Sequence, residues 1–291
     1  LASERNGVTL EKTFILNPNS YVIDVMHRVS KNNAAIGPLV LYTELVRDGS
    51  KLEESQFYST FTGPAVYTDK EKFNKLEFTD IEKNKITIPK QVPAGDPAWV
   101  AMVQHYYASA WIPSDKLNRD IYAGKIDTNV YRVGIQTPLE DIAAGKTTTE
   151  TARLFVGPQQ ESTLEAIAPG LELLKDYGYL TILAKPIFWT LERIYEYVHN
   201  WGWSIVILTF LIKLLFYPLS AASYKSMARM KEVQPKVMAM REANKGNPQK
   251  MNQEMMALYK KEKINPLGGC LPMLIQIPVF ISLYWVLLSS V

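Results

Sequence analysis

The sequence predicts an α+β membrane protein: an antiparallel β-sandwich followed by an interfacial helix, transmembrane helices and a cytoplasmic helical hairpin. Short β-rich runs separated by turn residues fill the first half of the chain. Two apolar stretches long enough to cross a bilayer follow, and the segment between them is basic. The expected divisions are the sandwich domain at 1–176, the interfacial helix at 177–200, the first transmembrane helix at 201–224, the hairpin at 225–263 and the second transmembrane helix at 264–291.

The first division alternates strand-like runs with turns of the Asn-Pro-Asn and Arg-Asp-Gly kind, a spacing typical of antiparallel strands in a sandwich. We expect the charge-dense run at 69–85 to form solvated loops and an edge strand. A short helix at 161–168 should end near Pro169 and Gly170. The runs expected to be strands are 8–16, 20–30, 38–46, 85–90, 99–113, 130–137 and 147–157.

Between Tyr179 and Val198, apolar residues recur every three or four positions, with charged residues on the opposite side. This pattern predicts a helix that lies in the membrane interface directly before the first crossing. An ordinary helix packed on the sandwich would show the same pattern, so both interpretations stay open. Because Pro186 would break the interior of a long helix, we expect a start or a kink there.

The first apolar stretch, 201–224, has a single charge, Lys213, close to its midpoint. A lysine at the centre of a membrane helix costs roughly 2.5–3.5 kcal/mol on insertion scales, so it needs compensation. Thr209 and Tyr217 lie one turn to either side of it and complete a polar stripe. The alternatives are a side chain that reaches the headgroups, a carboxylate partner on another helix, or a water-filled cavity. We favour the cavity.

The basic segment predicts two cytoplasmic helices, 224–243 and 249–262, joined by a turn at Gly246-Asn247-Pro248. It holds seven of the ten methionines of the chain. Methionine is common on surfaces that accept varied apolar partners, but it also fills ordinary helix–helix contacts. The candidate substrate contacts are Met227, Met230, Met251 and Met255, and the basic residues also suit anionic headgroups or a ribosome.

The second apolar stretch carries no charge and places Gln276, Phe280 and Tyr284 one helical turn apart. Gln276 could join helices by hydrogen bonds or line the same cavity as Lys213, and both roles stay open. Prolines 272 and 278 imply bends that neighbouring helices must accommodate. The candidate groove residues are therefore Lys213, Thr209, Tyr217, Gln276, Phe280 and Tyr284.

The distribution of charge predicts the orientation. Residues 1–200 carry a net charge of −4, whereas residues 225–263 carry +6. Short basic loops stay in the cytoplasm, so the hairpin should be inside and residues 1–200 outside. The single cysteine, Cys270, and three scattered histidines form neither a metal cluster nor a nucleophile pattern, and no phosphate-binding loop occurs. We expect no catalytic residue, metal or cofactor, no nucleic-acid chemistry, and a chain that is a fragment of a longer protein.

Two long runs carry a resemblance: TFLIKLLFYPLSAASYKSMARMKEVQPKVMAMRE and QEMMALYKKEKINPLGGCLPMLIQIPVFISLYW. They closely resemble the YidC membrane insertases of Gram-negative bacteria, within the wider YidC/Oxa/Alb group. The resemblance implies a periplasmic β-supersandwich, an interfacial helix and five core membrane helices around a hydrophilic groove in the inner membrane. It places arginine where this chain has Lys213, which keeps the positive charge but loses the forked hydrogen bonding.

The resemblance also implies a function. Members insert and help fold inner-membrane proteins, alone or with the Sec translocon, so the expected partners are nascent membrane proteins, the translocon, lipids and, at the hairpin, the ribosome. The alternative is a membrane-anchored periplasmic module that binds glycan or protein, and a channel or transporter ranks third. An anchor needs neither a buried lysine nor a methionine-rich hairpin, so the insertase is the preferred hypothesis.

Overall fold

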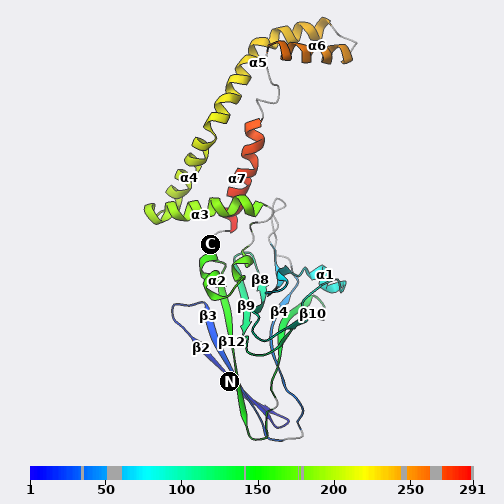
Figure 1. The fold of residues 1–291 in the computed structure, drawn as a ribbon, viewed down its shortest axis with the longest axis vertical. Coiled ribbons are helices and arrows are strands. Elements are labelled where there is room, and N and C mark those ends of the chain that lie inside the picture. The colour runs from blue at the N-terminus through cyan, green and yellow to red at the C-terminus, as the bar shows by residue number, and fades with distance from the viewer. Residues whose placement is uncertain are drawn as a thin grey trace. The chain divides into compact units, whose positions relative to one another are not determined.

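A computed structural model describes residues 1–33, 36–50, 61–140, 142–175, 177, 180–243, 248–262 and 271–289. The chain divides into two compact units, 1–176 and 177–288, and each is described by itself (Figure 1). The first unit is built almost entirely from strands, whereas the second is helical. The α+β prediction, with a β-sandwich followed by helices, is therefore confirmed.

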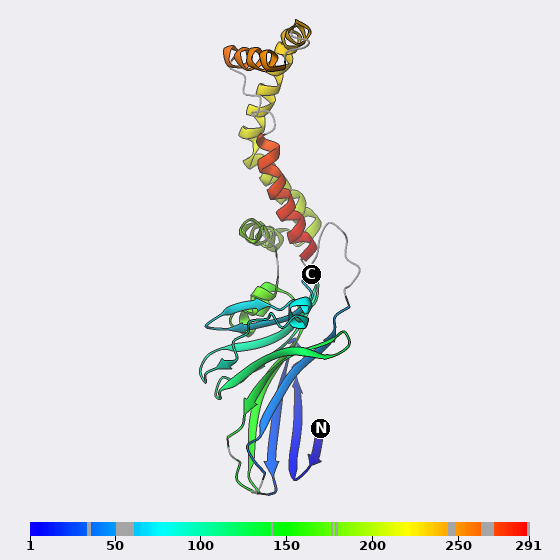
Figure 2. The same ribbon diagram turned by 90° about the vertical axis from the view of Figure 1, so that its right-hand side faces the viewer.

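The first unit consists of two antiparallel sheets (Figure 2). The larger sheet contains, in spatial order, β1 (Ala2–Arg5), β2 (Val8–Leu16), β3 (Val22–Lys31), β12 (Thr147–Pro158), β9 (Tyr107–Pro113), β8 (Ala98–Val103), β5 (Gly63–Thr68) and β6 (Lys72–Lys75). The smaller sheet contains β4 (Val40–Asp48), β11 (Val130–Pro138), β10 (Arg119–Asp127) and β7 (Gln91–Val92). The described part of the unit also contains the short helical segments α1 (Phe78–Glu82), α2 (Glu161–Ile167) and η1 (Leu171–Leu174).

The larger sheet is buried on both faces along β5 and β8. Val66, Val100 and Trp111 pack against the smaller sheet, in the core between the sheets. On the opposite face, Trp99 and Phe155 are covered by α2 and η1. Every residue of β5 and β8 is consequently buried, and neither strand shows the alternation of a half-exposed strand.

Most of the strand predictions are correct, and the exceptions have physical reasons. The run 8–16 is β2 residue for residue, and 99–113 holds the hairpin of β8 and β9. The expected strand at 85–90 is wrong: Ile86 and Ile88 pack on the core, but the backbone joins a sheet only at β7, after Pro89. Strands β5 and β10 were not predicted.

The described residues of the second unit form five α-helices: α3 (Thr181–Val198), α4 (Trp201–Leu215), α5 (Tyr217–Ala243), α6 (Pro248–Lys261) and α7 (Leu271–Ser289). Asn200 begins α4, where its Oδ1 accepts a hydrogen bond from the Trp203 N–H at 3.1 Å. Helix α3 runs through Pro186 and begins five residues before it, so the expected start at this proline is not observed.

One helix in the described part of the chain, α7, is by itself long and apolar enough to span a membrane. Helices α4 and α5 meet that condition only together, and they are bent by 57°. The single helix expected at 201–224 is thus divided at Phe216. Pro218 is the physical reason, because it has no N–H to donate to the Leu214 carbonyl, whereas a proline is tolerated in the first turn of a new helix.

Helix α5 then continues through the first arm of the expected hairpin, with Pro235 inside it and a change of direction along its length (Figure 1). The second arm is α6. The turn predicted at Gly246-Asn247-Pro248 lies outside the described residues, apart from Pro248, and so does Cys270.

Candidate functional site

Lys213 lies near the end of α4, and its ammonium group faces an aromatic ring of α7. The Lys213 Nζ is 5.2 Å from the centroid of the Phe280 ring. Within the described ranges, no carboxylate oxygen lies within 4.0 Å of this nitrogen. A cation–π contact contributes about 0.5–2 kcal/mol, depending on how far it is desolvated. The charge therefore has a ring face as its neighbour and no acid partner among these residues.

The other candidate groove residues are arranged less closely. Thr209 is half-buried one turn before Lys213 on α4, but Tyr217 lies beyond the 57° bend and is 68% exposed. Gln276 is half-buried and Tyr284 is 49% exposed, and both are one turn from Phe280 on α7. The structure thus brings Lys213 together with Phe280, and it interrupts the polar stripe between Lys213 and Tyr217.

A small apolar cluster holds α4 and α7 together with α3. Leu208 and Ile212 of α4 pack with Leu283 and Val286 of α7, and Leu191 of α3 completes the cluster. Each of these five side chains is at most 8% exposed. This packing fixes the faces on which Lys213 and Phe280 meet.

Two buried serines support the same packing, and we did not single them out from the sequence. The Ser204 Oγ donates to the Asn200 carbonyl at 2.8 Å, and the Ser282 Oγ donates to the Pro278 carbonyl at 2.7 Å. Both serines are 0% exposed. A small hydroxyl that bonds back to its own helix can be buried at low cost. The sequence feature that indicates such positions is a serine within an otherwise apolar run.

The outer faces of these helices are apolar and exposed. Phe210, Leu214 and Leu215 of α4 are 58–74% exposed, and Met273 and Leu274 of α7 are 60–67% exposed. Exposed apolar surface of this size indicates contact with lipid or with other apolar helices. The described helices thus have a packed side, to which Phe280 belongs, and an unpacked apolar side, and Lys213 is itself exposed.

The hairpin carries a cavity of about 330 Å³ between α5 and α6. Met227, Met230 and Met238 line it from α5, and Tyr259 lines it from α6. Lys231, Gln234, Val237 and Arg241 complete its wall. Of the four candidate methionines, Met227 and Met230 therefore line the cavity, whereas Met251 and Met255 do not.

Met238, Arg241 and Tyr259 were missed as candidate contacts. The residues of α5 that line the cavity follow one another at three- and four-residue spacing from Met227 to Arg241, so they form one helical face. This spacing is visible in the sequence, but the prediction was based on the number of methionines and not on their position on a helical face.

An ion pair joins the two arms of the hairpin. The Lys236 Nζ lies 2.8 Å from the Glu262 Oε1, and this hydrogen bond lowers the pKa of the Glu262 carboxyl below its usual value. Both side chains are partly or largely exposed, so the pair orients the arms more than it stabilises them.

No group of three or more histidine, cysteine, aspartate or glutamate side chains in the described ranges is placed to hold a metal ion. The helical unit presents a cation at Lys213, a cavity lined in part by methionines, and exposed apolar faces.

Comparison with known proteins assigns the family. Residues 1–190 match the family model of the YidC periplasmic domain, and residues 193–291 match that of the 60Kd inner membrane protein. The chain belongs to the YidC family. Its resemblance to the YidC insertases, expected from the runs around Lys213 and Gln276, is thereby confirmed.

The relatives of the chain in the YidC family are named membrane protein insertases and not enzymes. The protein from Polynucleobacter necessarius is 70% identical over 296 residues, which cover all of this chain and 53% of the relative. The protein from Polynucleobacter asymbioticus is 69% identical with the same coverage. That from Cupriavidus necator is 61% identical over all of this chain and 52% of the relative. The chain spans about half the length of the curated relatives that it matches.

Proposed function

We propose that the chain is part of an insertase that places inner-membrane proteins into the bilayer through a hydrophilic groove, and that Lys213 supplies the central positive charge of that groove. The observation that carries the proposal is the contact, at 5.2 Å, between the Nζ of the exposed Lys213 on α4 and the Phe280 ring on α7, two apolar helices. The relatives named as insertases support it.

The energetics favour a wet groove over a dry contact. A lysine at this depth costs roughly 2.5–3.5 kcal/mol, and a cation–π contact returns about 0.5–2 kcal/mol. The difference has to come from water or from the substrate, because no described carboxylate pairs with Lys213. An acidic or polar exported segment is the substrate part that such a charge would attract. Apolar substrate segments would leave sideways into lipid.

The proposed topology follows the charge. Residues 1–200 are periplasmic, 201–224 and 264–291 cross the inner membrane, and the +6 hairpin at 225–263 is cytoplasmic. Helix α3 would lie in the outer interface, where its exposed Trp189 and Tyr197 suit the headgroup region. The bend at Phe216 then falls within the first crossing.

The hairpin is proposed to receive nascent membrane segments before they reach the groove. The methionine-lined cavity supports this role, because flexible thioether side chains can repack around apolar helices of different shape. Met227 and Met230 would make the first contacts, with Met251 and Met255 on the second arm. Lipid headgroups, the ribosome and the Sec translocon are the further proposed partners.

The groove is tested by charge substitutions at Lys213 in the full-length protein. Reconstituted liposomes receive a short single-span substrate with an acidic exported tail, and protease protection of the tail measures insertion. Lys213→Arg should retain insertion, Lys213→Ala should reduce it, and Lys213→Glu should reduce it further because it reverses the field. Lys146→Glu, an exposed charge reversal in the sandwich, is the matched control.

Two controls separate a charge effect from a folding effect. Each variant must show the same expression and protease resistance as the unmodified protein. A substrate whose exported tail is neutral should depend less on Lys213 than the acidic one. Normal insertion of the acidic substrate by a stable Lys213→Glu protein would reject the electrostatic groove, and it would leave the membrane-anchored binding module as the better hypothesis.

The hairpin is tested separately. Photo-crosslinkers at Met230 and at Met238 should trap nascent membrane protein, because both residues line the cavity. A crosslinker at Asn252, an exposed position of α6 outside the cavity wall, is the control. Equal crosslinking from all three positions would indicate non-specific contact with the hairpin.

A further inference from the structure

The ring of Phe280 is held in place by packing, whereas the side chain of Lys213 is long and exposed. Phe280 is half-buried on α7 and packs against the apolar cluster that joins α3, α4 and α7. The same turn of α7 is tied together by the Ser282 Oγ, which donates to the Pro278 carbonyl at 2.7 Å. Lys213 has a flexible stem, and such a side chain can carry its ammonium group along the helix surface. The ring is thus the fixed member of the pair, and the ammonium group is the mobile one.

The contact of the Lys213 ammonium group crosses from α4 to α7. Phe210 and Phe216 lie about one turn before and after Lys213 in the sequence. The Nζ nevertheless lies over the ring of Phe280, 5.2 Å from its centroid, which is within the range of an attractive cation–π contact. A charge held in this way is directed toward the neighbouring helix. A lysine that extends along its own helix would instead move toward the headgroups.

An aromatic ring attracts the ammonium group without neutralising it. The ring carries a quadrupole and no net charge, so the positive charge of Lys213 is kept. The ring also faces only one side of a group that has three hydrogen-bond donors. In the described part of the chain, no ion pair or hydrogen bond of the Lys213 Nζ occurs. Its donors are therefore open on the side away from Phe280.

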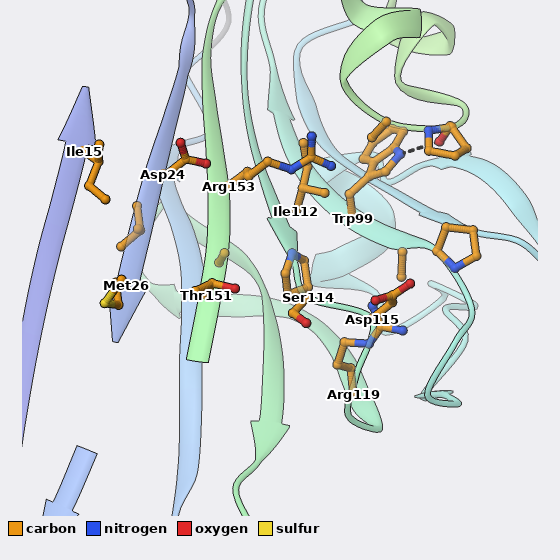
Figure 3. Close-up of a pocket in the computed structure, with 17 residues that line it drawn as sticks. Ile15, Asp24, Met26, Trp99, Ile112, Ser114, Asp115, Arg119, Thr151 and Arg153 are labelled. Atoms are coloured by element: carbon orange, nitrogen blue, oxygen red, sulfur yellow. Dashed lines mark hydrogen bonds between the residues drawn. The ribbon is translucent and has the colours of Figure 1, made fainter. Parts of the chain in front are cut away.

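Arg119 in the sandwich shows a different way to hold a cation. It is 1% exposed, and its Nη2 donates to the carbonyls of Pro93 and Asp96. Figure 3 shows that it also lies beside Asp115, at a pocket of the sandwich. Carbonyl and carboxylate partners hold a cation firmly, but they occupy its donors and compensate its charge. Partners of that kind at Lys213 would leave less of the charge for an incoming substrate.

We propose that Phe280 is a positioning residue of the insertion groove: its ring holds the Lys213 ammonium group over α7, while the donors of that group bind a carboxylate of the exported substrate segment. The inference rests on the proposed role of Lys213, and it names the residue that keeps the charge in place. Because ring and carboxylate occupy different sides of the ammonium group, the substrate does not displace the ring. The contact should make the held position about twofold to thirtyfold more populated than it would be without the ring.

The contact itself is tested by fluorine NMR of the full-length protein in nanodiscs. The resonance of para-fluorophenylalanine at position 280 should shift on Lys213→Gln, because a charge next to the ring is removed. The same label at Phe188, which packs on the same apolar cluster from α3, is the matched control and should keep its shift. Equal shifts at the two positions would indicate a general change in packing. That result, or an unchanged resonance at position 280, would overturn the proposal.

The effect on insertion is tested by fluorinating the Phe280 ring in steps, from one to three fluorine atoms. Each fluorine withdraws electron density from the ring face and so weakens the cation–π contact, with little change in the size of the ring. The initial rate of insertion of the substrate with the acidic tail should fall stepwise, by about twofold to thirtyfold in total. The substrate with the neutral tail should change less than about twofold, and so should both substrates when the same series is placed at Phe188.

A second background separates positioning from packing and from direct contact with the substrate. In Lys213→Gln, where the rate with the acidic tail is already lower, fluorination of Phe280 should cause no further loss. Equal losses in both backgrounds would show that the ring acts independently of Lys213. A rate that rises with fluorination would show that the ring competes with the substrate for the ammonium group. Either result would overturn the proposal.

Failure of this inference is distinguishable from failure of the proposed groove. If Lys213→Gln inserts the acidic substrate normally, Lys213 has no electrostatic role and both proposals are wrong. If insertion depends on Lys213 but not on the fluorination of Phe280, the groove stands and only the positioning role is wrong.

Discussion

Acidification should destabilise the sandwich through His27, a buried residue of β3. The side chain is 1% exposed, and in the described structure neither ring nitrogen has a hydrogen-bond partner. Burial and, less strongly, the positive charge of Lys12 lower the pKa of His27 from 6.5 to about 4, against an opposing contact with the Glu150 backbone. Lys12 is its cross-strand neighbour on β2, and the ring of Trp111 lies 6.4 Å away. The folded protein therefore prefers the neutral ring.

Proton linkage gives the direction and the size of the change in folding stability with pH. Below pH 6.5 the unfolded chain takes up a proton at His27, whereas the folded chain does so only near pH 4, so stability falls as the pH falls through this window. At 1.36 kcal/mol for each unit of pKa, the difference between the folded and unfolded pKa of His27 corresponds to about 3 kcal/mol of folding stability. That is a large fraction of the 5–15 kcal/mol that typically stabilises a domain.

Hydrogen exchange of the slowest amides in β3 and β12 measures this free energy in the whole chain, after correction for the pH dependence of intrinsic exchange. His27→Leu removes the titrating group and keeps an apolar side chain beside Trp111. The difference between the two proteins cancels other titrations, including that of Glu150, whose pKa is raised by burial. The unmodified chain should lose about 3 kcal/mol more than the variant between pH 7 and pH 4. Parallel losses in the two proteins would refute the assignment to His27.

Three further predictions concern the rest of the chain. In a Cys270→Ser background, cysteines at Ser50 and Gln253, both exposed, should be labelled from opposite sides of the inner membrane, and labelling of both from one side would contradict the topology. Gly170→Ala should destabilise the sandwich by about 2 kcal/mol or more, measured by urea unfolding, because Gly170 has φ 75° and a Cβ there would overlap the Tyr67 ring. A neutral effect would show that α2 and η1 do not pack as described. Pro218→Ala should straighten the junction of α4 and α5, so the distance between spin labels at Val206 and Glu232 should increase, whereas an unchanged distance would mean that packing and not the proline sets the 57° bend.

The sequence predicted those parts of the fold in which a local pattern carries the information. Strand β2 alternates and has clear turns at both ends, so its bounds were predicted correctly. Strand β5 was missed because all six of its residues are buried, and burial on both faces removes the alternation on which the prediction depends. The segment at 85–90 alternates like a strand, but in the described structure it forms no strand, and only its last residue, Lys90, accepts a backbone hydrogen bond from β10, at Ile121; this pairing is a property of the tertiary structure.

The candidate site shows the same division. Lys213 was predicted from its position alone, because a charge inside an apolar run is a local signal. The Phe280 contact required knowledge of how α4 packs on α7.

The change of direction within α5 has a mechanical consequence. Pro235 lies inside this helix, and Figure 1 shows that α5 turns before it joins α6. The 18 residues from Tyr217 to Gln234 span about 27 Å from the break at Phe216. Rotation of this segment by 10° about the break would displace its far end by roughly 5 Å, while Tyr217 at the near end would hardly move. A large movement of the hairpin would therefore produce only a small rotation next to Lys213.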